Sequence, residues 1–437
     1  MGTDYFDHSE QPQLAIIIQP HVRSWRLPRE PHIMLEEAVG LAEAINLEVV
    51  YQQTVPLPAP QASTFLRAGQ VEHIGEVADD YEHPLVIVNS SLTPVQQRNL
   101  ENKLKCKVID RTALILEIFG ARAQTHAGRL QVELAAMMFQ RSRLVRSWTH
   151  LERQRGGGGF LGGPGERQIE LDRRMLMDRV VRIKQELKDV QRTRHLQRRN
   201  RSRGETPTIA LVGYTNAGKS TLFNVLTGAD VLSKDMLFAT LDPTMRQTEL
   251  PSGRSIVLAD TVGFISQLPT ELIEAFKSTL EEVVEADLLL HVHDSSSDVL
   301  FEEADDVRQV LLDIGVGEDR LEHDVIHVMN KQDKSSDDLQ EAIAQKFPNA
   351  IATSAITKQG VEDVRNAVEG WLSRGNEICK LTLPPAAGQA RAWLYERGDV
   401  RASDYDDRGD LHLEVCLAKA DKLRFERLFP ELALHAL

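Results

Sequence analysis

Nine consecutive residues, GYTNAGKST, carry the strongest chemical signal in the chain. Their spacing matches G-x-x-x-x-G-K-[ST], a loop whose backbone amides surround a phosphate group. Within this loop Lys219 can bridge two phosphates, and the Ser220 hydroxyl can ligate Mg²⁺. An apolar run, TIALVG, precedes the loop and a helix-like stretch follows it, which is the context that a phosphate loop requires. The residues predicted to line the loop are Gly213, Tyr214, Thr215, Asn216, Ala217, Gly218, Lys219, Ser220 and Thr221.

Two further segments offer groups for the phosphates and the metal ion. SIVLADTVGF reads as a strand that ends at Asp260, with Gly263 three residues later. Asp260 can hold Mg²⁺ through water, and the Gly263 amide can sense the γ-phosphate. In MLFATLDPTM, Thr240 and Thr244 both carry a hydroxyl suited to Mg²⁺, and their distance along the chain from Ser220 does not choose between them. The strand segment contributes Asp260, Thr261, Val262 and Gly263 to the predicted site.

A third set of residues can read a base. VIHVMNKQD is a strand followed by Asn330, Lys331 and Asp333. The Asp333 carboxylate can accept hydrogen bonds from N1–H and N2–H₂ of guanine, whereas adenine offers neither donor. A polar group left unpaired in this way supports discrimination of roughly 10⁴-fold. TSAITKQG adds three residues expected against the guanine ring, Ser354, Ala355 and Ile356. Together the segments predict a GTP/GDP-binding switch with Mg²⁺ as cofactor.

The elements around these segments predict a multidomain α/β protein in four parts. Strand-like and helix-like runs alternate at the N-terminus, which favours a parallel sheet. The predicted parts are an N-terminal parallel α/β domain (1–112), an antiparallel long helical hairpin (113–204), a Ras-like P-loop GTPase domain (205–375) and a small C-terminal α+β domain (376–437). The polar stretch 376–389 marks the last boundary, and the strand candidates beyond it are 398–402 and 411–417.

The hairpin prediction follows from apolar residues in a 4-3 rhythm over 125–151 and again over 169–190, the pattern of a coiled-coil seam. Between them lies QRGGGGFLGGPGER. Because a helix rather than a strand enters this stretch, we interpret it as a mobile basic tip and not as a phosphate loop. A plain flexible turn is the alternative. The residues predicted to contact a polyanion are Arg153, Arg155, Gly156, Gly157, Gly158, Gly159 and Arg167.

Charge supports a polyanionic partner. The chain carries a net charge of −14, yet residues 141–204 hold 18 Arg and Lys against 7 Asp and Glu. A local excess of this kind favours a focused contact over general adhesion to nucleic acid. There is no run of 18 apolar residues, and the three cysteines are isolated, so we expect no membrane span, no disulfide framework and a cytoplasmic location.

Histidines at positions 291 and 293 have the spacing of a metal pair on one strand face. The strand reads as a core strand, so we interpret these histidines as packed and hydrogen-bonded rather than metal-binding.

The chain resembles the HflX family of ribosome-associated GTPases over roughly residues 30–375. The resemblance rests on VGYTNAGKSTLFN, LFATLDPT, DTVGFI, NKQD and the hairpin segment LVRSWTHLERQRGG followed by GGPGERQIELDRR. It implies that Thr240 is the Mg²⁺-binding switch threonine and a catalytic residue with Lys219 and Gly263. It also implies that the switch segment binds nucleotide through Phe238, Ala239, Thr240, Leu241 and Asp242. Gln70 and Arg167 depart from the family pattern, and the last 60 or so residues resemble it only loosely.

The resemblance implies the large ribosomal subunit as partner, with a role in dissociating or rescuing ribosomes under stress. A GTP-timed factor for large-subunit maturation or RNA binding is the alternative, and an ATP-driven RNA remodeller is a third. Many related switches orient the attacking water with a glutamine where this chain has Phe264. We therefore expect slow intrinsic GTP hydrolysis that the ribosome stimulates. We also expect the protein to be a monomer.

Overall fold

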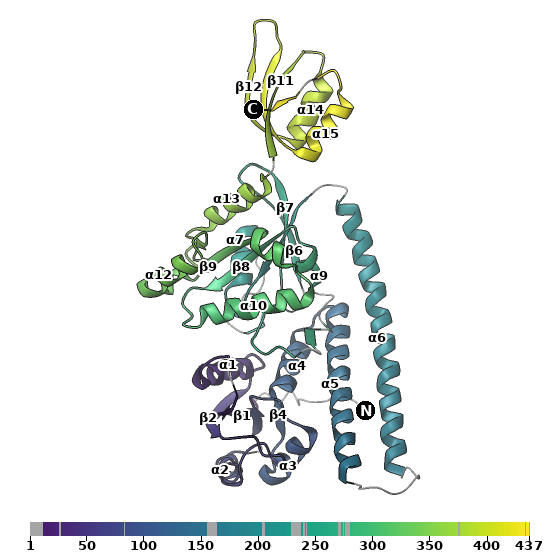
Figure 1. The fold of residues 1–437 in the computed structure, drawn as a ribbon, viewed down its shortest axis with the longest axis vertical. Helices are drawn as coiled ribbons and strands as arrows, with labels where there is room; N and C mark the ends of the chain where they lie inside the picture. The colour runs from purple at the N-terminus through teal and green to yellow at the C-terminus, as the bar shows by residue number, and fades with distance from the viewer. Residues whose placement is uncertain are drawn as a thin grey trace. The chain divides into compact units, whose positions relative to one another are not determined.

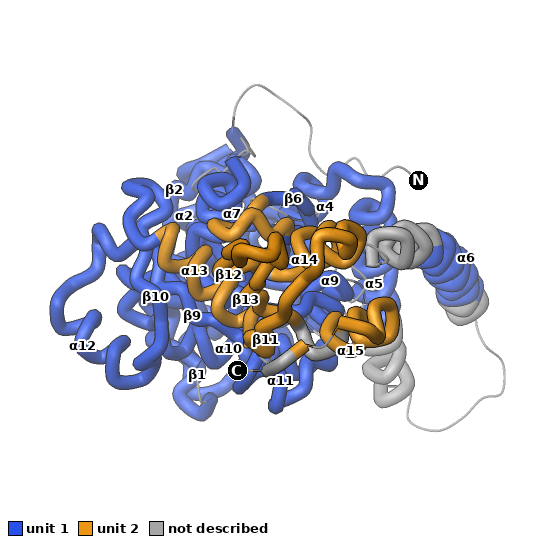
Figure 2. Tube along the Cα trace, turned by 90° about the horizontal axis from the view of Figure 1, so that it is seen from above, with its two compact units in different colours: residues 1–248, 256–360 blue, residues 249–255, 361–437 orange. Residues whose placement is uncertain are grey.

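The computed structural model forms two compact units, residues 1–248 with 256–360 and residues 249–255 with 361–437 (Figure 2). The multidomain α/β fold expected from the sequence is confirmed, with three separate sheets. The residues that the structure describes are 12–25, 28–82, 84–154, 164–202, 206–228, 237–238, 241, 243–269, 272–273, 275, 280–374, 376–432 and 434–436. None of the described helices is long and apolar enough to cross a bilayer.

The first sheet of the larger unit is parallel, with strand order β2-β1-β3-β4. Its strands are β1 (Leu14–Val22), β2 (Glu48–Leu57), β3 (Leu85–Val88) and β4 (Val108–Asp110), and its helices are α1 (Pro31–Glu43), α2 (Ala68–Asp79), α3 (Pro94–Leu104) and α4 (Arg111–Arg122). Residues 15–20 of β1 are all buried, as expected for a strand covered on both faces. Thr93 caps α3 by accepting a hydrogen bond from the Gln96 amide.

Two long helices follow, α5 (His126–Gln154) and α6 (Pro164–Ser202), and they pack against each other (Figure 1). The predicted seam is buried at Leu130, Leu134, Val180, Ile183 and Leu187. Three described positions of the predicted rhythm differ, because Met137, Leu176 and Val190 are only partly buried, while Met138 is buried. A helix with 3.6 residues per turn drifts against a strict 4-3 rhythm. The glycine-rich tip, including Arg155 and Gly156 to Gly159, lies outside the described residues, as do the side chains of Arg153 and Arg167.

The second sheet of this unit has the order β10-β9-β8-β5-β7-β6. Its strands are β5 (Thr208–Val212), β6 (Thr244–Glu249), β7 (Ser255–Asp260), β8 (Leu288–Asp294), β9 (Val325–Asn330) and β10 (Ile351–Ala352). Its helices are α7 (Lys219–Thr227), α9 (Glu281–Glu285), α10 (Leu300–Ile314), α11 (Glu318–His323) and α12 (Asp337–Lys346). β5 pairs in parallel with both β7 and β8, so the segments that follow these strands meet at one edge of the sheet.

The smaller unit holds an antiparallel sheet of order β12-β13-β11-β14. Its elements are α13 (Val361–Leu372), β11 (Asn376–Leu383), α14 (Gly388–Arg397), β12 (Asp399–Tyr405), β13 (Leu411–Ala418), α15 (Lys419–Leu428) and β14 (His435–Ala436). The strand candidates 398–402 and 411–417 correspond to β12 and β13. The sequence pattern missed β11, since the stretch interpreted as a boundary, 376–389, begins with an eight-residue strand whose alternate residues are buried.

Candidate nucleotide-binding site

Two glycines shape the loop between β5 and α7. Gly213 has a φ of +151°, and a Cβ there would lie 2.1 Å from the Val292 carbonyl oxygen. Gly218 has a φ of +87°, and a Cβ there would lie 2.2 Å from Asn330 Nδ2. A side chain at Gly213 would therefore displace strand β8, and a side chain at Gly218 would displace Asn330, the last residue of β9. The loop is built for close approach of backbone, as a phosphate-binding loop must be.

Lys219 lies across this loop. Its side chain is almost fully buried, and Nζ donates a 2.7 Å hydrogen bond to the Tyr214 carbonyl oxygen. Burial lowers the pKa of Lys219 to about 8, while the nearby Asp260 carboxylate opposes that shift. A polyanion entering the loop would favour the charged ammonium group. The structure thus places a single desolvated cation where the sequence predicted the phosphates.

Ser220 and Asp260 form the next contact. Ser220 Oγ, on the first turn of α7, donates a 2.7 Å hydrogen bond to Asp260 Oδ2 at the end of β7. Asp260 is completely buried. A hydroxyl and a carboxylate are hard oxygen ligands of the kind that Mg²⁺ prefers, so the residues present fit that ion.

Gly263 lies beside Lys219. A Cβ at Gly263 would come within 3.1 Å of Lys219 Nζ and within 2.9 Å of Thr215 Cγ2. The loop after β7 is bonded to the phosphate loop by two backbone hydrogen bonds, from the Thr215 amide to the Phe264 oxygen and from the Phe264 amide to the Gly213 oxygen. The Phe264 side chain is buried in the core. It packs away from solvent, which accords with the expectation that it does not orient water.

The end of β9 joins the phosphate loop to a second loop. Asn330 Nδ2 donates to the Ala217 oxygen at 2.9 Å, and Asn330 Oδ1 accepts from the Ala355 amide at 2.9 Å. One buried side chain therefore links residues more than 130 positions apart. The sequence predicted Asn330 and Ala355 as site residues, and the structure brings both to the same edge of the sheet.

The remaining residues expected at the base lie around this junction. Lys331 has a left-handed backbone, and its Nζ forms a 2.7 Å ion pair with Asp294 at the end of β8. Asp333 is exposed, and a hydrogen bond from Ser354 lowers the pKa of its carboxyl group. Ile356 is 70% exposed. An exposed carboxylate and an exposed apolar side chain therefore lie in the segments that follow β9 and β10.

The switch segment between α7 and β6 is described only in part. Phe238 is buried with a φ of +56°, and its ring meets that of Phe119 edge-on, with centroids 4.8 Å apart. Leu241 is also buried. Thr240, together with Ala239 and Asp242, lies outside the described residues, so the choice between Thr240 and Thr244 stays a prediction.

Sequence reasoning missed a group of polar residues behind the phosphate loop. The Tyr214 hydroxyl donates to Glu37 Oε2 at 2.6 Å and accepts from Arg29 Nη1 at 2.7 Å. It also accepts from the Ser266 amide at 2.8 Å. Arg111 donates to Glu37 and to the Ser266 oxygen. Of these residues only Tyr214 lies in a motif, and that motif did not predict its partners, since Glu37 and Tyr214 are 177 positions apart and neither type is distinctive by itself.

Four family models match the chain, and together they span most of it. They are described as GTP-binding GTPase N-terminal (residues 32–120), GTP-binding GTPase Middle Region (122–201), 50S ribosome-binding GTPase (208–331) and HflX C-terminal domain (339–433). The last match includes the C-terminal residues that resembled the family only loosely by motif.

Individual relatives give the same result. "GTPase HflX" from Magnetococcus marinus is 47% identical over 396 residues, covering 90% of this chain and 90% of that protein. "GTPase HflX" from Escherichia coli is 41% identical, covering 91% of this chain and 93% of that protein. Among solved structures, a GTP-binding protein from Sulfolobus solfataricus in complex with GDP is 24% identical, with a TM-score of 0.44, covering 83% of this chain and 99% of that chain.

Proposed function

Because this chain belongs to the HflX family of GTPases and is a GTP-hydrolysing enzyme, we propose that it works as a nucleotide switch on the large ribosomal subunit. In this proposal the GTP form binds the subunit and separates or rescues ribosomes under stress, and the GDP form leaves. The support is twofold: the match to a family model described as a 50S ribosome-binding GTPase, and the basic segment 141–204. A cytoplasmic location follows from that partner.

The observation that carries the proposal is the meeting of Lys219, Gly263 and the Ser220–Asp260 pair at one sheet edge. Lys219 would bridge the β- and γ-phosphates, and the loop amides from residue 213 onward would surround the β-phosphate. The Gly263 amide would contact the γ-phosphate. At the other end of the site, Asp333 would accept from the guanine edge, with Ser354 orienting its carboxylate.

Magnesium would be held by the Ser220 hydroxyl, by Asp260 through water and by Thr240. A bound Mg²⁺ ion neutralises charge on the phosphates. The Ser220 hydroxyl donates its hydrogen bond to Asp260, so the two groups already lie together at the expected Mg²⁺ site before any ion binds. Because the two side chains are already ordered, they lose little conformational entropy when the ion binds, which favours tight binding of Mg²⁺.

Nucleotide state would be transmitted through the loop that follows β7. This loop is hydrogen-bonded to the phosphate loop at Thr215 and Phe264. Loss of the γ-phosphate contact at Gly263 would therefore change the conformation of both loops. Because Phe264 is buried, the attacking water must be positioned by other groups. We propose that docking on the ribosome completes that arrangement. GTP turnover should then rise when large subunits are added, and equal rates with and without them would defeat the idea.

The hairpin would make the ribosome contact. Helices α5 and α6 share a buried seam, and the sequence of the segment 141–204 is strongly basic. Arg153, Arg155, Arg167 and the run Gly156 to Gly159 would touch ribosomal RNA there, where glycine permits close approach to a phosphate backbone.

Sedimentation of ribosomes tests this proposal. Intact 70S particles are incubated with the protein and GTP, GDP or a non-hydrolysable GTP analogue, then separated on a sucrose gradient. With the analogue we expect separated subunits and protein on the large subunit; with GDP, intact particles and free protein. Lys219→Ala, tested with the analogue, should behave as the GDP sample. Particles that stay joined, with protein found only on free large subunits, would instead favour the maturation factor.

A further inference from the structure

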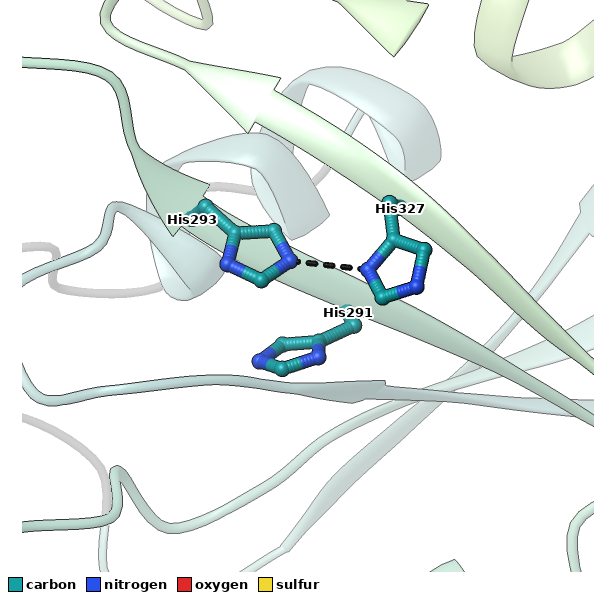
Figure 3. Close-up of side chains that lie close together, drawn as sticks. All are labelled: His291, His293 and His327. Carbon is teal, nitrogen blue, oxygen red and sulfur yellow. Dashed lines mark hydrogen bonds between the residues drawn. The ribbon is translucent and has the colours of Figure 1, made fainter. Parts of the chain in front are cut away.

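Three histidines gather on one face of the second sheet (Figure 3). His291 and His293 are two residues apart on β8, and His327 lies on β9, directly opposite His291 in the strand register. The first two are buried and the third is partly buried. In the part of the chain that the structure describes, this is the one group of three or more His, Cys, Asp or Glu side chains placed to hold a metal ion.

The ring nitrogens of the three histidines converge. One nitrogen from each ring lies within 4.8 Å of the other two, and His293 Nε2 is 3.0 Å from His327 Nδ1. Two nitrogen ligands about 2.05 Å from a tetrahedral ion are roughly 3.3 Å apart. The His293–His327 pair is already close to that spacing, and the His291 nitrogen, which lies within 4.8 Å of the other two, would move toward them by ring rotation to enclose one ion. The packed and hydrogen-bonded arrangement interpreted from the sequence is present, and His327 adds the third ligand that the spacing of the pair could not reveal.

We propose that His291, His293 and His327 bind one transition-metal ion of the zinc class, at a site separate from the oxygen ligands expected for Mg²⁺. Three imidazoles suit Zn²⁺, Co²⁺, Ni²⁺ or Cu²⁺ and do not suit Mg²⁺. Three protein nitrogens leave one position of a tetrahedral ion for water.

The surroundings favour this binding in two ways. Burial lowers the pKa of all three imidazoles, that of His327 to about 4, so each ring is neutral and offers a lone pair. The Phe347 ring covers the cluster, with its centroid 4.6 Å from that of His327 and 5.3 Å from that of His293. A hydrophobic shell of this kind controls solvent access and the local dielectric around a metal ion.

An ion bound to these three histidines would link two strands of the sheet. It would tie β8 to β9 a few residues before their carboxyl ends. At those ends Asp294 pairs with Lys331, and Asn330 links the two nucleotide loops. Metal binding would thus stabilise the strand pair that carries the predicted guanine-reading residues, and it would raise the thermal midpoint of the protein without any nucleotide present.

Cobalt titration tests the site. The full-length protein is stripped with a chelator, freed of nucleotide and titrated with Co²⁺, whose tetrahedral complexes absorb visible light. We expect one equivalent to bind, Zn²⁺ to displace it and the thermal midpoint to rise. His327→Phe should lower the Co²⁺ affinity about 100-fold or more. The control His323→Gln alters an exposed histidine on α11 and should change nothing, and Ser220→Ala should retain the full signal.

X-ray absorption on the zinc-loaded wild-type protein provides a measurement that needs no variant. A first shell fitted by three imidazole nitrogens supports the proposal. A shell of oxygens alone would indicate that the ion binds at the nucleotide site, and a sulfur shell would indicate binding to a cysteine. Either result overturns the proposal. So does unchanged Co²⁺ binding in His327→Phe.

Discussion

The hydroxyl of Tyr214, in the phosphate loop, donates a 2.6 Å hydrogen bond to the carboxylate of Glu37, in the first helix of the N-terminal sheet. The same hydroxyl accepts from Arg29 and from the Ser266 amide, so all of its hydrogen-bonding capacity is used. Burial, followed by the charge of Glu37, raises the pKa of Tyr214. A neutral phenol thus joins the N-terminal helix, the phosphate loop and the loop after β7.

Removing this hydroxyl should loosen the loop after β7. In Tyr214→Phe the buried Ser266 amide loses its acceptor, which costs about 1–3 kcal/mol. We expect hydrogen exchange of the Ser266 amide to accelerate by roughly 5- to 150-fold, which is the same free energy expressed as a ratio. Tyr51→Phe is the control, because its hydroxyl lies 3.3 Å from His73 at an exposed site. Unchanged exchange at Ser266 would contradict the account.

The motifs predicted the phosphate and guanine residues as one site because each of them follows its own strand. Parallel strands end at one sheet edge, and there the structure brings Lys219 beside Gly263 and Asn330 beside the phosphate loop. Lys219, Gly263 and Asn330 could therefore be found from spacing. Glu37 could not, since its role depends on how helix α1 meets a loop far away in the sequence. The same limit applies to His327, whose partnership with His291 depends on strand register.

Local sequence signals mark the starts of the helices in the N-terminal domain unequally. Thr93 and Pro94 announce α3 with a capping box and a proline at the first helical position. Helix α2 begins at Ala68, after the N-cap residue Arg67, which is not a usual capping type. Helix α4 follows β4 with no intervening residue. The Asp110 side chain accepts a hydrogen bond from the Ala113 amide, so α4 does have an N-cap, but no turn residue separates it from the strand before it.

Nucleotide affinity should depend on pH through Lys219. In the empty site burial lowers the pKa of Lys219 to about 8, whereas bound phosphates favour its charged form. Below pH 8 the free protein already carries the proton, so affinity is constant. Above pH 8 binding requires proton uptake, and GDP affinity should fall by up to about tenfold per pH unit.

Calorimetry of GDP binding in two buffers of different ionisation enthalpy measures that proton uptake directly. Burial raises the pKa of Glu303 to about 7, so this carboxyl group is already ionised above pH 8. It therefore adds nothing to the pH dependence of GDP affinity in that range. Lys219→Arg is the matched control, since a guanidinium group does not titrate here. Its affinity should be weaker than that of the wild type and flat with pH; a wild-type profile that is equally flat disproves the mechanism.

Base selection should change when Asp333 becomes an amide. Asp333→Asn replaces one acceptor oxygen with an NH₂ group that faces guanine N1–H or N2–H₂, so GTP affinity should fall by about 100-fold or more. Xanthine carries a carbonyl where guanine has N2–H₂ and should be preferred by the variant. Competition between fluorescent GDP and xanthosine diphosphate measures this change in base preference. Asp337→Asn, an exposed carboxylate in the first turn of α12, should leave the ranking unchanged.

Two glycines with left-handed backbones allow a test of the loop itself. A Cβ at Gly218 would lie 2.2 Å from Asn330 Nδ2, whereas a Cβ at Gly228, the C-cap of α7, would meet nothing within 4 Å. Both alanine variants carry the left-handed strain of about 1–2 kcal/mol, but only Gly218→Ala displaces the asparagine. We expect Gly228→Ala to lower the thermal midpoint and keep GDP affinity. Gly218→Ala should lose roughly 100-fold in affinity, since two hydrogen bonds of Asn330 depend on its position. Equal GDP affinities in the two variants would mean that Asn330 does not hold the loop.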